Sequence, residues 1–324
     1  MPKISVILPA YNAERYIAAA VNSVLAQTFG DFEFIIVNDG STDRTEAILR
    51  KIAMNDSRVR LISRPNTGYV PALKEAIDAA HGKYLARMDA DDIAHRERFA
   101  RQVDLLDRQR DVTVVGTSYE LIDARGRHLH EQHQPTDDGT LQRHCLAGTT
   151  PICHPTAMFR RDAYYAVGGY DASACPAEDL DLWLRLGEVG RLACLPELLL
   201  QYRLHADSVS ETKQAKQIDS ARRTCEAAAE RRGITSLFKA ADWRESVGQA
   251  GRLRQTLKYG WWAFNSGERK TAMTYGVKAV GTSPTSVAAW KLLGCGVLKP
   301  MPAGVASHGG TGFNWLAAWF GRPA

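Results

Sequence analysis

The N-terminal part of the chain alternates short apolar runs with helical patterns, and no other feature restricts the fold as strongly. The apolar runs have the length and composition of buried strands and occupy Ile4–Leu8, Phe32–Val37, Val59–Ile62, Lys83–Met88 and Val112–Val115. Helical patterns lie between them at about residues 13–27, 43–55, 67–80 and 95–109. This alternation predicts an open, mostly parallel α/β sheet flanked by helices. Such sheets bind ligands beyond the carboxyl ends of their strands.

An acidic cluster, Asp89-Ala90-Asp91-Asp92, directly follows the fourth apolar run. Three carboxylates in four residues repel one another unless a cation lies among them. Hard oxygen ligands of this kind favour Mg²⁺ or Mn²⁺, especially when a substrate diphosphate completes the coordination. The cluster therefore predicts a metal site for a nucleotide phosphate, and the alternative is a solvated acidic turn that caps the next helix. An EF-hand is excluded, because Ile93, Ala94 and Ala100 stand where a calcium loop needs an oxygen ligand, Gly and Glu.

Two further polar segments follow predicted strands, namely Pro9-Ala10-Tyr11-Asn12 and Asn38-Asp39-Gly40-Ser41. We expect both to meet the acidic cluster at one edge of the sheet. No GxGxxG follows the first strand and no GxxxxGK[ST] occurs, so dinucleotide and P-loop sites lack their phosphate-binding glycines. Taken alone, the first segment is also explained as a strand end and the second as a turn.

Composition divides the chain into two parts. Residues 1–210 carry 24 Lys and Arg against 29 Asp and Glu, whereas residues 211–324 carry 17 against 7, within a total net charge of +5. We expect an α/β domain at 1–210 and a basic, mainly helical region at 211–324. Six scattered cysteines without a CxxC pair are typical of a reducing compartment, so we expect a cytoplasmic protein. No stretch approaches the ~20 apolar residues of a membrane span.

The basic region combines helical spacing with aromatic residues. Ile218, Ala221, Cys225 and Ala228 have helical spacing, and Tyr259, Trp261, Trp262 and Phe264 form an aromatic cluster. Together with Trp290 and Trp315, this composition suits adhesion to an anionic membrane surface. The alternative is a soluble helical unit whose aromatic side chains pack in its own core. No recognisable motif orders these residues for nucleic acid, so we expect no nucleic-acid partner, and the oligomeric state stays unknown.

A second acidic pair, Glu178-Asp179, precedes a leucine-rich run. Leu180, Leu182 and Leu184 alternate like a strand, although the same run also fits a helix face, so periodicity leaves the element undecided. If the run is a helix, the pair complements the dipole at its N-terminus. A zinc site at His144, Cys145, Cys153 and His154 is a further alternative, but the seven-residue gap between the cysteines is not that of a short zinc knuckle.

The ordered set of these segments resembles the family 2 inverting glycosyltransferases with the GT-A fold, over roughly residues 3–210. The matching segments are Ser5–Asn12, Val37–Asp43, Asn66-Thr67-Gly68, Met88–Asp92 and Glu178-Asp179. The resemblance implies a helix beginning at the Glu178-Asp179 pair.

The resemblance also implies a role for each matching position. Asp39 would accept a hydrogen bond from the imide of uracil, a donor that cytosine and adenine lack. The other nucleotide-binding positions would be Pro9, Ala10, Tyr11, Asn12, Asn66, Gly68, Asp89 and Ala90. Asp91 would be the main ligand of a Mn²⁺ or Mg²⁺ ion that bridges the diphosphate, with Asp89 beside it.

For the reaction, Asp179 resembles the family's general base, and Glu178 would shape the site or bind the acceptor. In the segment Gln201–Ser208, Arg203 would reach the diphosphate and His205 would join the metal. This segment lacks the Trp that follows the corresponding Arg of processive members, which favours addition of a single sugar. The resemblance thus implies transfer from a nucleotide-sugar, with UDP as the expected nucleotide, to an acceptor hydroxyl of a glycan or lipid-linked molecule, with inversion.

Other functions match fewer of these residues. A haloacid-dehalogenase-like phosphatase needs Thr where this chain has Ile93. A nucleotidyltransferase acting on sugar phosphates starts from a Gly-rich loop after its first strand, which Pro9–Asn12 is not. That enzyme and a non-catalytic nucleotide-binding protein remain the alternatives. The sequence does not identify the sugar or the acceptor.

Overall fold

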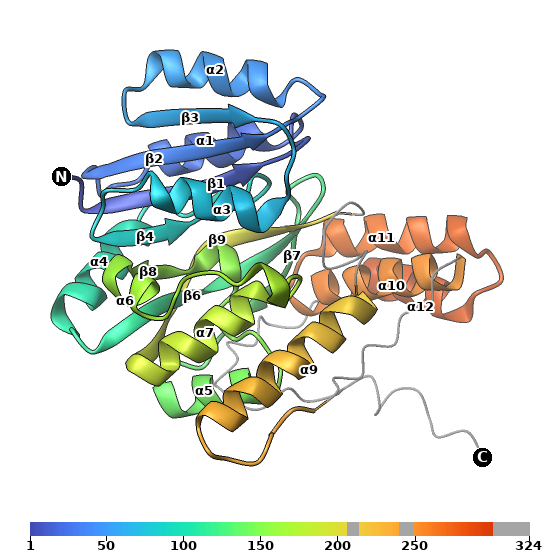
Figure 1. Ribbon diagram of the computed structural model, residues 1–324. Helices are drawn as coiled ribbons and strands as arrows, with labels where there is room; N and C mark the ends of the chain where they lie inside the picture. The colour runs from blue at the N-terminus through green and yellow to red at the C-terminus, as the bar shows by residue number, and fades with distance from the viewer. Residues whose placement is uncertain (206–213, 240–248, 301–324) are drawn as a thin grey trace.

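The computed structural model describes residues 1–205, 214–239 and 249–300 (Figure 1). Its sheet contains β1 (Ile4–Ala10), β2 (Phe32–Asp39), β3 (Val59–Arg64), β4 (Tyr84–Arg87), β5 (Ile93–Ala94), β6 (Val112–Asp123), β7 (His128–Gln132), β8 (Met158–Arg160) and β9 (Arg191–Leu204). The helices of the first 205 residues are α1 (Ile17–Leu25), α2 (Thr45–Asn55), α3 (Tyr69–Asp78), α4 (Arg98–Arg108), α5 (Asp138–Leu146), α6 (Arg161–Ala166) and α7 (Glu178–Val189). The later ones are α9 (Gln214–Arg231), α10 (Gln249–Asn265), α11 (Arg269–Thr282) and α12 (Val287–Leu298).

The strands follow the order β3-β2-β1-β4-β8-β6-β9-β5, with β7 paired to β6. β1 to β4 are parallel, as predicted, so their carboxyl ends share one edge. Beyond β4 the sheet becomes mixed, because β8 runs antiparallel to both β4 and β6 whereas β9 runs parallel to β6. The GT-A type of fold expected from the sequence is therefore confirmed, with a mixed second half.

Both faces of the sheet are covered, which explains why its strands read as nearly continuous apolar runs. In β1, Ile7 joins the apolar cluster beneath α3 and α7, whereas Val6 and Leu8 join the cluster beneath α1, α2 and α4. In β2, Ile35 joins the cluster beneath α3 and α7, and Phe34 joins the cluster beneath α1, α2 and α4. This burial on two sides makes the central strands a rigid support for the loops at their carboxyl ends.

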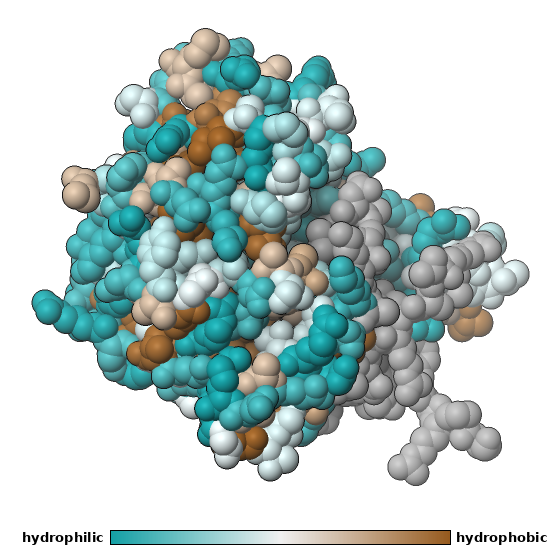
Figure 2. Space-filling model, in the orientation of Figure 1, coloured by the Kyte–Doolittle hydropathy of each residue, from teal (hydrophilic) through white to brown (hydrophobic). Residues whose placement is uncertain are grey.

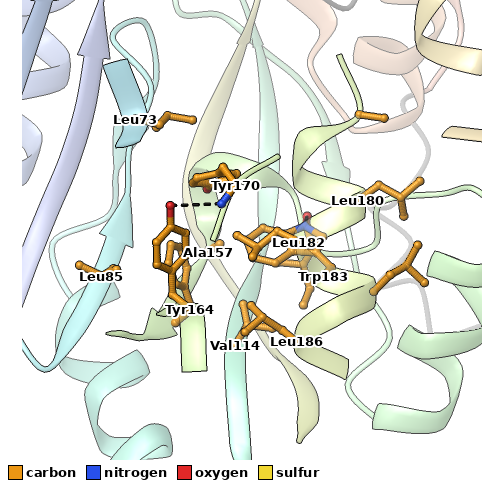
Figure 3. Close-up of a cluster of buried hydrophobic side chains, with 14 of the residues drawn as sticks. Leu73, Leu85, Val114, Ala157, Tyr164, Tyr170, Leu180, Leu182, Trp183 and Leu186 are labelled. Carbon is orange, nitrogen blue, oxygen red and sulfur yellow. Dashed lines mark hydrogen bonds between the residues drawn. The ribbon is translucent and has the colours of Figure 1, made fainter. Parts of the chain in front are cut away.

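The undecided leucine-rich run is a helix, α7. Figure 3 shows its side chains in the core beside β6 and β8. The indole nitrogen Nε1 of Trp183 donates to the carbonyl oxygen of Ile152 at 3.1 Å. Nearby, the backbone N–H of Tyr170 donates to the hydroxyl of Tyr164 at 3.2 Å. The Trp183 contact anchors the middle of α7, whose first two residues are the acidic pair.

The predicted C-terminal helices are present in the described residues, and they pack in two groups. α9 contributes Ala221, Cys225 and Ala228 to the same core cluster as Trp183. α10, α11 and α12 form a separate cluster against β6 and β7, in which Tyr259 is buried. The other predicted aromatic residues of α10, namely Trp261, Trp262 and Phe264, also pack in or against that cluster.

Two further expectations concern the membrane. Trp290 is exposed on α12, whereas Trp315 lies outside the described residues. Within the part of the chain that the structure describes, no helix combines the length and apolar character needed to cross a bilayer.

Candidate active site

The first two polar loops interlock at the carboxyl edge of the sheet. The backbone N–H of Asn12 donates to Ser41 Oγ at 3.0 Å, and the backbone N–H of Thr42 donates to Asn12 Oδ1 at 2.8 Å. Asn12 has a φ of 47°, a left-handed conformation that asparagine tolerates better than most residues. Pro9 and Ala10 end β1 in buried positions, whereas the neighbouring Tyr11 is exposed. These two loops therefore contact each other at the carboxyl edge of the sheet.

Asp39 binds the third predicted loop. Its Oδ1 accepts hydrogen bonds from the backbone N–H of Thr67 at 3.0 Å and from Arg64 Nη2 at 2.8 Å. Its Oδ2 accepts from the backbone N–H of Gly68 at 3.0 Å. A carboxylate oxygen can accept two hydrogen bonds, so Oδ2 retains capacity for one more donor.

Gly40 brings the loops still closer. It has a φ of +70°, and a Cβ added there would lie 2.5 Å from the backbone nitrogen of Asn66. Only glycine fits this close approach without displacing the backbone. Asn66 itself is exposed beside the predicted base-binding positions.

The acidic cluster lies in the loop between β4 and β5. Ligand oxygens of Asp89, Asp91 and Asp92 all lie within 4.8 Å of one another. Asp92 is buried, and its Oδ1 accepts the backbone N–H of Arg203 at 2.8 Å. Its Oδ2 is buried without a hydrogen-bond partner among the described residues. An unpartnered buried carboxylate oxygen within a carboxylate cluster fits a bound divalent cation.

The pKa values of the clustered carboxyl groups also indicate a cation site. Burial raises the pKa of Asp89, and the charge of Asp91 raises it further, although the ion pair with Arg87 opposes the shift. The pKa of Asp92 lies well above its usual range because of burial and the charges of Asp91 and Asp89. Carboxylates that raise one another's pKa in this way are stabilised by a cation.

The end of β9 joins this cluster. His205 Nε2 lies 2.8 Å from Asp91 Oδ2, so two of the predicted metal ligands lie together. Arg203 is buried, its Nε donates to the carbonyl oxygen of Asp91 at 2.7 Å, and its Nη1 donates to that of Asp123 at 3.2 Å. The guanidinium therefore holds the aspartate loop, and its predicted contact with the diphosphate stays a prediction.

Glu178 and Asp179 begin α7, as predicted. Glu178 Oε2 is buried without a hydrogen-bond partner in the described part of the chain, and Asp179 Oδ1 accepts the backbone N–H of Leu180 at 2.8 Å. Burial and the charge of Glu178 raise the pKa of Asp179 to about 7. A carboxylate with this pKa is a competent general base near neutral pH.

Asp179 also lines a cavity of about 220 Å³. Its wall includes Thr149 from the loop after α5, Gln217 and Ile218 from α9, and Phe238 from the segment that follows α9. Gly148 permits this arrangement, because a Cβ there would lie 2.6 Å from the Phe238 ring. The basic C-terminal region thus contributes to a space that opens onto Asp179.

Several site residues were not predicted from the sequence. Arg87, buried on β4, pairs with Asp89 and donates to the hydroxyl of Tyr69, and its charge lowers the pKa of Asp179. The hydroxyl oxygen of Tyr69 in turn lies 3.3 Å from His154 Nδ1. The one sequence signal for this group was Arg87 itself, a single charged residue within an apolar strand pattern.

His154 also decides the zinc alternative. Its Nε2 lies 2.6 Å from the hydroxyl of Tyr170, so both ring nitrogens are used in hydrogen bonds. Burial lowers the pKa of His154 well below its usual range, so the ring is neutral. The proposed cluster of His144, Cys145, Cys153 and His154 is not among the groups of potential metal ligands in the described residues, so the zinc alternative is wrong.

A sheet of this type with an aspartate cluster at its carboxyl edge is consistent with a glycosyltransferase. The family model for glycosyl transferase family 2 matches residues 5–168. A putative glycosyltransferase, EpsE of Bacillus subtilis (strain 168), is 35% identical over 229 residues, which cover 68% of this chain and 80% of that protein. The chain belongs to glycosyl transferase family 2 and is a glycosyltransferase.

Solved structures share the fold at low sequence identity. TarS 1–349 of S. aureus in complex with UDP-GlcNAc aligns with a TM-score of 0.55 at 16% identity, over 90% of this chain and 91% of that chain. The mannosyltransferase PcManGT of Pyrobaculum calidifontis, in complex with GDP-Man and Mn²⁺, gives 0.53 at 20% identity, over 91% and 79%. Both alignments extend beyond the residues that the family model matches.

Proposed function

We propose that this glycosyltransferase transfers one sugar from a UDP-sugar to an acceptor hydroxyl by a metal-dependent single displacement that inverts the anomeric carbon. The observation that carries the proposal is the presence, in one structure, of a carboxylate cluster beside His205 and of a carboxylate, Asp179, whose pKa is about 7. The first arrangement suits a departing diphosphate, and the second suits an attacking hydroxyl.

Asp89, Asp91 and His205 would hold Mn²⁺ or Mg²⁺, and such an ion, when bound, stabilises the charge that grows on a departing diphosphate. Arg203 supports this set by holding the backbone of Asp91. Asp92 would help to position this set of ligands, because its Oδ1 accepts the backbone N–H of Arg203. The Mn²⁺ of the PcManGT complex is consistent with this assignment.

Asp179 would take the proton of the acceptor hydroxyl as that hydroxyl attacks. Its place on the wall of the 220 Å³ cavity gives an acceptor a position next to the base. Glu178 maintains the basicity of Asp179 through like-charge repulsion. Attack from the side opposite the leaving diphosphate inverts the anomeric configuration.

Uracil is proposed as the base because Oδ2 of Asp39 retains capacity for one more donor, and the imide of uracil supplies one. The structural neighbours carry UDP-GlcNAc in one case and GDP-Man in another. The acceptor class that we propose is a glycan or lipid-linked molecule of the cell envelope, reached from the cytoplasmic face of the membrane.

Competitive binding of nucleoside diphosphates tests the donor. With Mn²⁺ present, we expect UDP to bind more tightly than GDP, ADP or CDP, as measured by calorimetry on the full chain. Asp39→Asn should reduce this preference, because the amide replaces one acceptor with a donor. Equal affinity for all four nucleotides would contradict the assignment of uracil, and binding of UDP without turnover of any UDP-sugar would favour a non-catalytic nucleotide-binding protein.

A further inference from the structure

α12 is apolar on two opposite faces. One face, with Ala289, Leu292 and Cys295, is buried in the cluster that α10 and α11 share. The opposite face exposes Val287 (81%), Trp290 (55%), Val297 (50%) and Leu298 (82%). Their spacing of three, ten and eleven residues from Val287 places all four on one side of the helix. An apolar face on a surface helix marks an interaction site.

The surface is preformed. Arg269 donates to the carbonyl oxygens of Gly296 at 2.7 Å, Val297 at 3.1 Å and Lys299 at 2.8 Å, and so caps the C-terminal end of α12. At the other end, Trp290 Nε1 donates to the carbonyl oxygen of Pro284 at 2.8 Å. The exposed side chains therefore project from a helix that is fixed at both ends.

Positive charge surrounds this face. Lys291 lies on the same side of the helix as Val287 and Leu298, and Lys299 and Arg269 lie at its end. Residues 249–300 contain eight Lys and Arg, and Glu268 is their one acidic residue. In Figure 2 these projecting helices show hydrophobic side chains among hydrophilic ones. A tryptophan and aliphatic side chains bordered by cations are complementary to an anionic lipid surface.

We propose that the exposed face of α12, formed by Val287, Trp290, Lys291, Val297 and Leu298, docks on the surface of a bilayer that contains anionic lipid. The apolar side chains insert at the level of the headgroups, and the cations at the rim pair with lipid phosphates. A second copy of the chain would bring the same seven net positive charges to the contact and so repel this region. The proposal gives the proposed function a location, and its test does not require turnover.

Sedimentation of the full chain with vesicles tests the proposal. The protein should bind vesicles of equal parts phosphatidylglycerol and phosphatidylcholine, and should not bind pure phosphatidylcholine. Added salt should release it, because the Debye length falls from ~10 Å at 0.1 M to ~3 Å at 1 M. Equal binding to both vesicle types, or no binding to either, would overturn the proposal.

Three variants assign the binding to α12. Leu298→Ser should weaken partition about tenfold, since it removes one inserted side chain. Lys291→Gln should weaken it about fivefold, through loss of one cation near the lipid. Met54→Ser, on the distant α2, is the matched control because Met54 is 79% exposed, and it should bind like the parent.

Other occupants of the face give different results. Unchanged binding of Leu298→Ser would overturn the role of α12. A dimer in vesicle-free solution that Leu298→Ser dissociates would assign the face to a second copy. Binding that appears only when residues 301–324 are removed would assign it to that segment of the chain.

Discussion

His205 Nε2 lies 2.8 Å from Asp91 Oδ2, although 114 residues separate the two in the chain. The contact exists because β9 runs beside β5 and β6, so that its last residues reach the loop that carries the acidic cluster. Arg203, two residues earlier, binds the same loop through Asp92 and through the carbonyl oxygen of Asp91. The candidate metal site is therefore assembled from two distant segments.

Replacement of His205 should weaken the metal site without unfolding the protein. We expect His205→Asn to raise the Mn²⁺ concentration for half-maximal activity by about 10–100-fold. Asp91→Asn should abolish transfer, while the free energy of unfolding without metal should fall by no more than about 1 kcal/mol, because one charge of a repelling cluster is removed. Metal titration of activity and urea denaturation are the measurements. Unchanged Mn²⁺ dependence in His205→Asn would remove this residue from the site.

Asp179→Asn keeps the size of the side chain but removes the proton acceptor. We expect the rate of transfer to fall by about 10²–10⁴-fold, while the affinity for the nucleotide stays within about twofold of the parent. The matched variant is Glu178→Gln, which leaves Asp179 in place and should cost less. If Asp179→Asn turns over as fast as the parent, a different residue acts as the base.

The pH dependence of the rate follows from the pKa of Asp179, which is about 7. A general base is active when deprotonated, so kcat should rise with pH between about pH 6 and pH 8 and then level off. Glu178→Gln removes a charge that raises this pKa, so the rise should move to lower pH. A rate that is flat across this range would contradict the assignment.

Much of the site could be predicted from the sequence, because parallel strands bring their carboxyl ends to one edge. The loops at Asn12, Asp39 and Asp91 lie at one edge of the sheet for that reason. Tyr69, Arg87 and His154 could not be found in this way, since their contacts join separate elements and depend on side-chain geometry rather than spacing.

The second half of the sheet was harder to predict. β9 is a 14-residue strand, but Pro196 and Glu197 interrupt its alternation. The pairing with β6 passes from Leu195 to Leu198, so these two residues bulge from the ladder. Proline lacks a backbone N–H and is tolerated in such a bulge. β6 likewise extends to Asp123, eight residues past the predicted Val115, and this extension is hard to predict because Thr117 and Ser118 are polar although both are buried.

Gly40→Ala should destabilise the protein. The left-handed φ and the contact of an added Cβ with the Asn66 backbone together cost on the order of 1–3 kcal/mol of unfolding free energy. Gly30→Ala is the matched control, because a Cβ there meets nothing within 4 Å. Urea denaturation of both variants is the measurement. Equal midpoints would show that the loops are not packed as closely as described.

Transfer from a UDP-sugar to an added acceptor, with and without metal, tests the central claim most directly. The released nucleotide is identified by chromatography, and the anomeric configuration of the product by proton NMR. We predict release of UDP in Mn²⁺, an inverted product, and no release in EDTA or with Asp91→Asn. Full turnover in EDTA, a retained configuration, or release of pyrophosphate in place of UDP would contradict the account.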